Sequence, residues 1–218
     1  MSNIEFDPRD PRLSYVDARA LWALVGVFAA IELALTVADW GIAPNLRGTA
    51  FIYGAFWSAL LDETLPVYAL QPYTMFVTHA FLHGSLIHLG LNGAILLAIG
   101  RIIVVGSSQS RAVLIFLLSA IGGAAVYNAF AGPELAPMVG ASGGVFGYFA
   151  VWKRWELQGY RAAGVSADPV WKFLIGFLVI NVALTFVMPN IAWAAHLGGF
   201  ITGWLLAPAL RRAPRPLM

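Results

Sequence analysis

The feature that most constrains this chain is a series of apolar segments, most of them long enough to cross a lipid bilayer. A transmembrane helix needs about 20 residues to cross about 30 Å of hydrocarbon. The chain has 218 residues, of which 60% are hydrophobic and 11% charged, so it holds more apolar surface than one water-soluble core buries. The sequence predicts an all-α polytopic membrane protein with six transmembrane helices. The segments lie at 20–37, 84–105, 112–131, 142–157, 170–188 and 191–210.

One membrane domain accounts for the chain, because it shows no internal repeat, low-complexity stretch or second domain. We expect a short cytoplasmic N-terminal tail at 1–18, the membrane domain at 19–210, and a basic cytoplasmic C-terminal tail at 211–218. The run at 20–37 is too long for the apolar part of a signal peptide and lacks a small-residue cleavage site. The sequence has no cysteine, which excludes disulfides and cysteine nucleophiles.

The basic residues predict the orientation, since cytoplasmic flanks carry lysine and arginine in excess. A cytoplasmic N-terminus leaves only Arg47 of the 13 basic residues on the outer side. The positive charges therefore report topology, and we expect no nucleic-acid partner. The cytoplasmic set is Arg9, Arg12, Arg19, Arg101, Arg111, Lys153, Arg154, Arg161, Lys172, Arg211, Arg212 and Arg215.

Four polar residues share the outer half of the predicted membrane domain. In this orientation the helices at 84–105, 142–157 and 191–210 run from outside to inside, and each carries its polar residues near its start. These residues are His88, Asn92, Ser142 and His196. Ionisable residues inside a membrane are costly and are functional candidates by default.

The helix beginning at Ser142 is predicted to be short. The 16 residues from Ser142 to Leu157 cover only about 24 Å at 1.5 Å per residue. We therefore expect this helix to start below the outer surface, with the preceding loop dipping into the protein toward an aqueous cavity. Ser142 would then lie at a submerged helix N-terminus.

Glycine spacing predicts which helices touch. Gly143 and Gly147 lie four residues apart on one helix, and Ala195, Gly199 and Gly203 do so on another. Such stripes of small residues let membrane helices approach closely. Close packing here would bring the His196 imidazole to the Ser142 hydroxyl. A serine needs such a base to become a nucleophile, which makes the pair a candidate catalytic dyad. Alternatively, Ser142 caps its helix and His196 is a hydrogen-bonded core residue.

His88 and Asn92 are candidate donors to a developing oxyanion. They are four residues apart and so share one helix face, and both side chains donate hydrogen bonds. The Ser142 backbone N–H is a third candidate donor. Such preorganised donors stabilise the charge that forms in acyl transfer. The alternative is that His88 and Asn92 only join neighbouring helices by hydrogen bonds.

Three sequence stretches together resemble the rhomboid intramembrane serine proteases. They are HAFLHGSLIHLGLN (79–92), GASGGVFG (140–147) and AHLGGFITG (195–203), with His196 following Ser142 by 54 residues. The resemblance covers the six-helix core and implies that Ser142 is the nucleophile and His196 the general base and acid. It also implies that His88, Asn92 and the Ser142 amide form the oxyanion site.

The resemblance assigns supporting positions as well, and this sequence departs from it at one place. Gly140 would belong to a strained approach to the nucleophile, and Phe146 would stack on the catalytic histidine. Gly143 and Gly199 would form the close helix contact. The family's tryptophan–arginine pair in the first loop falls at Thr74 and Met75, so that anchor is missing.

The loop at 41–83 and three further ionisable residues complete the sequence-based expectations. We expect that aromatic-rich loop to be partly embedded in the outer leaflet. Glu32 has no obvious partner in sequence, and we expect it to be protonated or hydrogen-bonded to Asn128, Asn181 or Thr185. The alternative is that it relays protons or binds a cation. His79 and His83 have no assigned chemistry. A zinc site formed with the other histidines is an alternative, although HAFLH lacks the glutamate of an HExxH helix.

These observations predict a serine endopeptidase that cleaves single-pass transmembrane proteins through a dyad and an acyl-enzyme. The resemblance implies substrates with a small residue at the cleavage site and a readily unwound helix, entering beside the helix at 170–188. We expect no cofactor, and a prokaryotic inner membrane with the active site opening to the non-cytoplasmic side. A catalytically silent rhomboid-like protein that binds membrane clients and a small-solute transporter are the alternatives. The oligomeric state is open.

Overall fold

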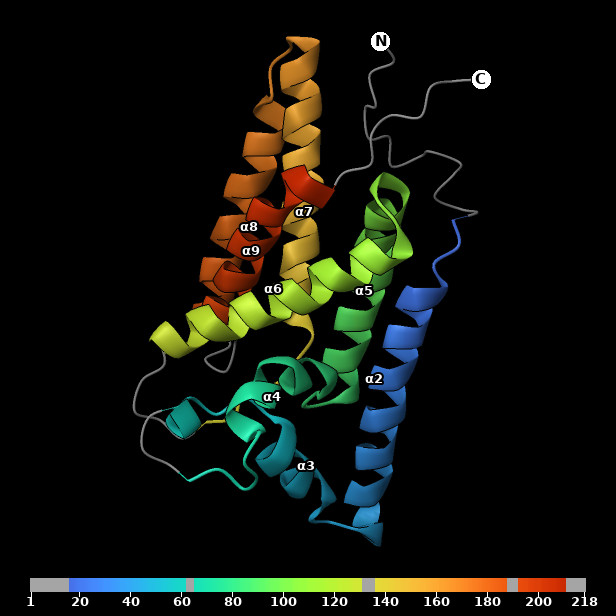
Figure 1. Cartoon of the computed structure of the whole chain (residues 1–218), viewed down its shortest axis with the longest axis vertical. Coiled ribbons are helices and arrows are strands. Elements are labelled where there is room, and N and C mark those ends of the chain that lie inside the picture. Colours follow the sequence, from blue (N-terminus) through green and yellow to red (C-terminus); the bar gives the residue numbers. More distant parts are fainter. Residues whose placement is uncertain (1–15, 62–64, 131–135, 188–191, 211–218) are drawn as a thin grey trace.

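The computed structural model describes residues 16–61, 65–130, 136–187 and 192–210. Within these ranges every regular element is a helix, apart from one isolated antiparallel bridge between Phe56 and Met138. The predicted all-α fold class is therefore confirmed. In chain order (Figure 1) the elements are α2 (Arg19–Val37), η1 (Ala38–Ile42), α3 (Leu46–Gly54), η2 (Ser58–Leu61), α4 (Gln71–Thr78), η3 (His79–Phe81), α5 (Leu86–Gly106), α6 (Gln109–Phe130), α7 (Ser142–Ala163), α8 (Asp168–Val187) and α9 (Trp193–Leu210).

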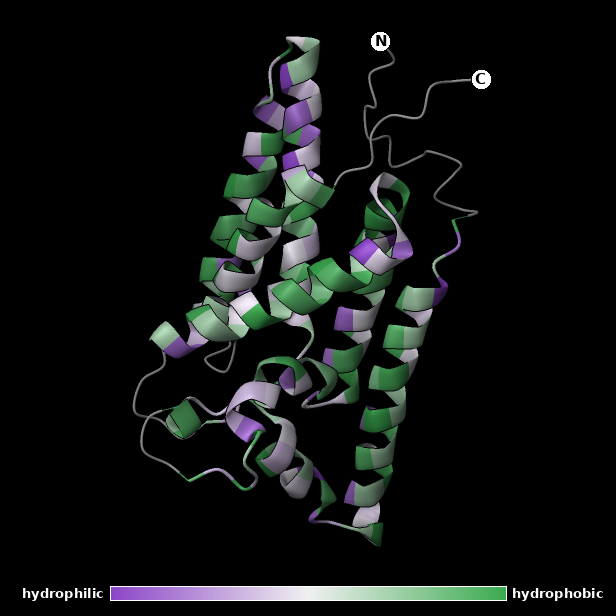
Figure 2. Ribbon diagram, in the orientation of Figure 1, coloured by the Kyte–Doolittle hydropathy of each residue, from purple (hydrophilic) through white to green (hydrophobic). Residues whose placement is uncertain are grey.

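Four helical segments of the described chain are long and apolar enough to cross a membrane. They are Arg19–Ile42, Leu86–Gly106, Gln109–Phe130 and Asp168–Val187. Figure 2 shows α2 apolar along nearly its whole length, as expected for a helix whose side chains face lipid. The two other long helices, α7 and α9, lie where the remaining two spans are predicted, but they are not among these four. The count of six transmembrane helices therefore stays a prediction. Most of the predicted N-terminal tail and all of the C-terminal tail lie outside the described residues.

Helix α7 is longer than the sequence predicted, which corrects the short helix proposed at 142–157. It continues to Ala163, for 22 residues, and ends where Gly164 adopts a left-handed conformation with φ of 68°. The charged residues after position 152 do not stop the helix. Lys153 is buried in a 2.6 Å ion pair with Glu156 and lies over the Trp152 ring. Figure 1 nevertheless shows that α7 begins near the middle of the long axis of the molecule, whereas α2 reaches its lower end.

Helices α6, α7 and α9 pack together as the centre of the fold, with glycines at the points of closest approach. A Cβ built on Gly199 would lie 2.7 Å from the carbonyl carbon of Gly143, and one on Gly203 would lie 2.7 Å from the Cα of Gly147. The predicted close contact between the two glycine stripes is confirmed. Helix α8, in contrast, contacts α7 and α9 sparsely, and Val170 is its one buried residue among those described.

The segment between α2 and α5 folds largely into short helices. Figure 1 shows α3 and α4 toward the end of the molecule where α2 terminates, and α4 contacts α3 and α6. Tyr53 is half exposed, whereas Phe56 is fully buried with Met75 and Met138 in a small hydrophobic cluster. Where this segment sits relative to a lipid interface remains a prediction. Within the protein, it packs against the residues that precede α7.

Candidate active site

The chain approaches Ser142 along an extended segment that is fixed at two points. Phe56 and Met138 exchange two backbone hydrogen bonds of 3.0 and 2.9 Å, and the Gly140 N–H donates to the His79 carbonyl at 2.9 Å. Gly140 has φ of 129°, a conformation that side chains disfavour. A Cβ there would also lie 2.7 Å from the His88 ring. Gly140 therefore occupies a position at the approach to Ser142 that would be strained for any residue with a side chain, in agreement with the resemblance.

Ser142 is the first residue of α7, and its hydroxyl is directed at His196. Its Oγ lies 3.0 Å from Nε2 of His196, although 54 residues separate the two in sequence. Ala141 is the N-cap of α7, and the helix has no side-chain capping bond. Ser142 therefore makes no capping bond to α7, and its hydroxyl bonds to His196 instead. A serine within hydrogen-bond distance of an imidazole is the arrangement that nucleophilic catalysis requires.

Phe146 packs against one face of the His196 ring. The two rings stack with centroids 4.0 Å apart and an angle of 14° between their planes. This stacking was predicted from the resemblance and is present in the structure. Nδ1 of His196 is buried and has no hydrogen-bond partner among the described residues. The ring is thus oriented by packing against Phe146 and by its bond to Ser142.

His88 and Asn92 lie on α5 and border Gly140, two residues before Ser142. Asn92 is 6% exposed, and its Nδ2 has no hydrogen-bond partner within the described chain. A buried donor without a partner is costly, so one that lies beside a candidate nucleophile is free to bind a ligand. A Cβ on Gly140 would contact both side chains, at 2.9 Å from His88 Nε2 and 3.9 Å from Asn92 Nδ2. The structure therefore brings Ser142, His196, His88, Asn92 and Gly140 to one place.

His79 and His83, which have no assigned chemistry, both lie close to the candidate site. His79 is buried, its Nδ1 lies 2.8 Å from the Met75 carbonyl, and its own carbonyl accepts from Gly140. Burial lowers the pKa of His79 from 6.5 to about 4. His83 is fully buried between Phe28 and His88, with ring centroids 5.5 and 5.1 Å away. His79 thus helps to hold the approach to Ser142, and His83 packs against His88.

The prediction for Glu32 was wrong, because its partner is Arg47. The guanidinium donates to both carboxylate oxygens of Glu32 at 3.0 Å, and Thr36 adds a 3.3 Å bond. Asn181 and Thr185 instead bond to carbonyls within α8. Arg47 lies 15 residues after Glu32, in α3, and no helical spacing pairs the two positions.

The position of the missing tryptophan–arginine pair is filled differently in this chain. Met75 is fully buried against Phe56 and Met138, and the Thr74 hydroxyl lies 2.8 Å from the Tyr68 hydroxyl. Gln71 adds bonds to the Ile52 carbonyl and the Val67 amide. Apolar packing and local hydrogen bonds therefore hold α4 in place.

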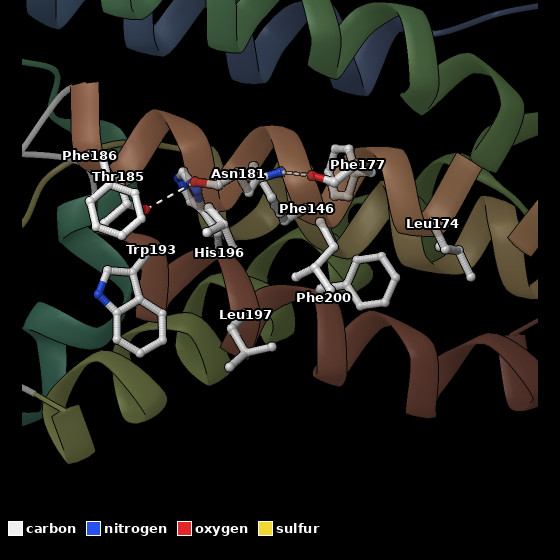
Figure 3. Close-up of a pocket in the computed structure, with 12 residues that line it drawn as sticks. Phe146, Leu174, Phe177, Asn181, Thr185, Phe186, Trp193, His196, Leu197 and Phe200 are labelled. Atoms are coloured by element: carbon white, nitrogen blue, oxygen red, sulfur yellow. Dashed lines mark hydrogen bonds between the residues drawn. The ribbon is translucent and has the colours of Figure 1, made fainter. Parts of the chain in front are cut away.

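An apolar cavity extends to His196. It has a volume of about 520 Å³ and is lined by residues of α7, α8 and α9. Figure 3 shows His196 among the lining side chains, with Asn181 and Thr185 as the polar residues of α8. In the part of the chain that the structure describes, no three histidine or acidic side chains gather in a metal-binding arrangement.

Comparison with known proteins agrees with this geometry. A family model described as the rhomboid domain matches residues 70–213. RHOMBOID-like protein 2 of Arabidopsis thaliana is 31% identical over 140 residues, which are 62% of this chain and 41% of that protein. Rhomboid-type serine protease 2 of Emericella nidulans is 30% identical over 145 residues, or 65% of this chain and 28% of that protein. The chain thus matches less than half the length of these relatives. Because the domain match covers most of its residues, the chain belongs to the rhomboid family.

Proposed function

We propose that this protein is an intramembrane serine endopeptidase that cleaves single-pass transmembrane proteins. The observation that carries the proposal is the 3.0 Å contact between Ser142 Oγ and His196 Nε2. It is supported by the unpartnered amide of Asn92 beside the same helix start. Membership of the rhomboid family and the similarity to a fungal rhomboid-type serine protease agree with this assignment.

The proposed reaction begins when Nε2 of His196 accepts the proton of the Ser142 hydroxyl. The serine oxygen attacks the substrate carbonyl, and the carbonyl oxygen takes up the negative charge. His88, Asn92 and the Ser142 backbone N–H donate hydrogen bonds to that oxygen. His196 then gives its proton to the leaving amine, which produces the acyl-enzyme. A water molecule, deprotonated by His196, hydrolyses the ester and restores Ser142.

The stacked Phe146 ring has a defined part in this scheme. The imidazole has to accept a proton from one oxygen and deliver it to a nitrogen without rotating away from either. Phe146 covers one face of the ring at 4.0 Å, which restricts that rotation. Nδ1 finds no acid among the described residues, so we propose a dyad rather than a triad.

We propose that the substrate helix approaches beside α8. This helix packs loosely on its neighbours, and the apolar cavity between α8 and α9 extends to His196. An apolar path suits a peptide segment that leaves the lipid. We further propose that both chain ends are cytoplasmic and that the site opens to the non-cytoplasmic side. The relatives are from a plant and a fungus, so they give no support to a prokaryotic inner membrane in particular.

The test is cleavage of a single-pass transmembrane substrate by the purified protein in lipid vesicles. We expect Ser142→Ala and His196→Ala each to abolish cleavage while the protein stays folded. Ser166→Ala is the matched control, because the Ser166 hydroxyl only accepts a 3.2 Å bond from the Asp168 N–H and lies beyond the far end of α7 from Ser142. It should cleave at the wild-type rate. Cleavage by purified Ser142→Ala would overturn the mechanism.

A fluorophosphonate probe separates this proposal from a catalytically silent client-binding protein. The probe labels a serine only when a base activates its hydroxyl. We expect labelling at Ser142 in the wild type and none in His196→Ala. A wild-type protein that binds transmembrane segments but resists the probe would favour the silent alternative.

A further inference from the structure

Arg47 joins three separate parts of the chain through one guanidinium. It donates to both oxygens of Glu32 on α2, to Asp39 in η1 at 2.6 Å, and to the His83 carbonyl at 3.1 Å. The Glu32 side chain is fully buried, and that of Arg47 is 20% exposed. A planar guanidinium fits a carboxylate with two parallel bonds, which fixes its orientation as well as its position.

The acceptor at His83 connects this network to the candidate oxyanion site. His83 precedes α5, and its ring lies edge-on to the His88 ring, with centroids 5.1 Å apart and planes at 71°. Ser85, between them, caps α5 by accepting from the His88 N–H at 3.2 Å. The His88 ring in turn lies directly against Gly140. The residue whose carbonyl accepts from Arg47, His83, is therefore close to His88 both in sequence and in space.

We propose that Arg47 is a positioning residue for His88 in the proposed protease reaction. By bonding the His83 carbonyl while held by buried Glu32, it fixes the segment that enters α5. That segment sets the position of the His88 ring beside Gly140. The inference rests on the proposed function, since a positioned oxyanion donor has consequences only where an oxyanion forms. Donors of this kind act through preorganised geometry, so a small displacement lowers the rate.

The substitution Arg47→Lys distinguishes an effect of hydrogen-bond geometry from an effect of positive charge. Arg47→Lys keeps the positive charge beside Glu32, but one ammonium group cannot reproduce the two parallel bonds and the bond to the His83 carbonyl. We expect the rate of Ser142 acylation by a fluorophosphonate, per folded molecule, to fall about tenfold. The KM for a transmembrane substrate should stay the same, because Arg47 does not face the cavity.

The matched control removes another buried ion pair that lies away from the site. Glu156→Gln breaks the 2.6 Å bond to Lys153 in the second half of α7. We expect it to lower thermal stability and leave the acylation rate per folded molecule unchanged. If Arg47→Lys does not fold, Glu32→Gln replaces it, because it also disrupts the two-pronged bond and should give the same kinetic signature.

The decisive measurement combines these variants with His88→Ala. If Arg47 acts through His88, Arg47→Lys should lower acylation about tenfold in the wild type and less than about twofold in the His88→Ala background. Equal losses in both backgrounds, or no loss in either, would overturn the inference. A wild-type protein that neither cleaves nor labels would instead refute the proposed function, so the two failures are distinguishable.

Discussion

The contact between α7 and α9 predicts that one added methyl group at Gly199 separates Ser142 from His196. A Cβ at this position would lie 2.7 Å from the Gly143 carbonyl carbon and 3.0 Å from its Cα. Both are main-chain atoms, so no flexible side chain gives way. Carbon atoms pack at about 3.5 to 4.0 Å, and the two helices therefore have to separate by about 1 Å.

That separation acts directly on the candidate dyad. Gly143 follows Ser142, and Gly199 lies about one helical turn after His196. The Gly143–Gly199 contact and the Ser142–His196 contact therefore lie at nearly the same height along the two helices. The distance from Ser142 Oγ to His196 Nε2, now 3.0 Å, would grow to about 4 Å and leave hydrogen-bond range. We expect Gly199→Ala to lower kcat by about 100-fold and the free energy of unfolding by about 1 to 3 kcal/mol.

The assay pairs initial cleavage rates in vesicles with thermal unfolding followed by tryptophan fluorescence. Gly26→Ala is the matched control, since nothing lies within 4 Å of a Cβ there and the position is also inside a long apolar helix. It should cleave normally and lose no stability, because alanine favours helix more than glycine does. Wild-type cleavage by Gly199→Ala would refute the reasoning from helix separation.

Two further predictions follow from the packing around the site. Phe146→Ala should lower kcat about tenfold through loss of the stack on His196, whereas Phe146→Tyr should keep it; comparing their kcat values at equal folded concentration checks this. His79 lies outside the candidate membrane spans, and its pKa is depressed to about 4. The unfolded chain therefore binds the proton more readily, and stability present above pH 6.5 is lost as the pH falls toward 4. His79→Asn, which retains a donor to the Met75 carbonyl, should weaken this dependence in thermal unfolding measured from pH 7 to 4, and an unchanged dependence would count against it.

The candidate dyad was predictable because small residues determine how helices meet. The four-residue spacing of Gly143 and Gly147 matches that of Gly199 and Gly203, and glycine stripes pack backbone against backbone. Once those stripes are aligned, Ser142 and His196 fall at the same level. The spacing of the glycines, rather than the identity of the reacting side chains, therefore made the position of the dyad predictable.

The partner of Glu32 was not predictable in the same way. Arg47 lies in the segment after α2, where no helical period relates it to Glu32, and only tertiary folding brings the two together. One signal was present, because Arg47 is the one basic residue that the predicted topology leaves on the outer side. A charge that violates the positive-inside pattern, with a buried carboxylate nearby in sequence, favours an ion pair over a topological role.

The length of α7 was misjudged for a local reason. Lysine, arginine and glutamate are good helix formers, so the charges after Trp152 continue the helix even though they suggest a membrane boundary. The helix ends at Gly164, whose left-handed conformation is a common helix stop. That glycine, rather than the charges, was the stop signal in the sequence.

The order of the helices along the chain has a consequence for biosynthesis. Ser142 begins α7, but its proposed base lies on α9, and α8 has to be made and inserted between them. Until α9 packs against α7, the serine hydroxyl has no partner to take its proton. On the proposed mechanism, a nascent chain that lacks α9 would therefore have no activated nucleophile. If the protein has the proposed function, its activity begins only when α9, the last of the described helices, packs against α7.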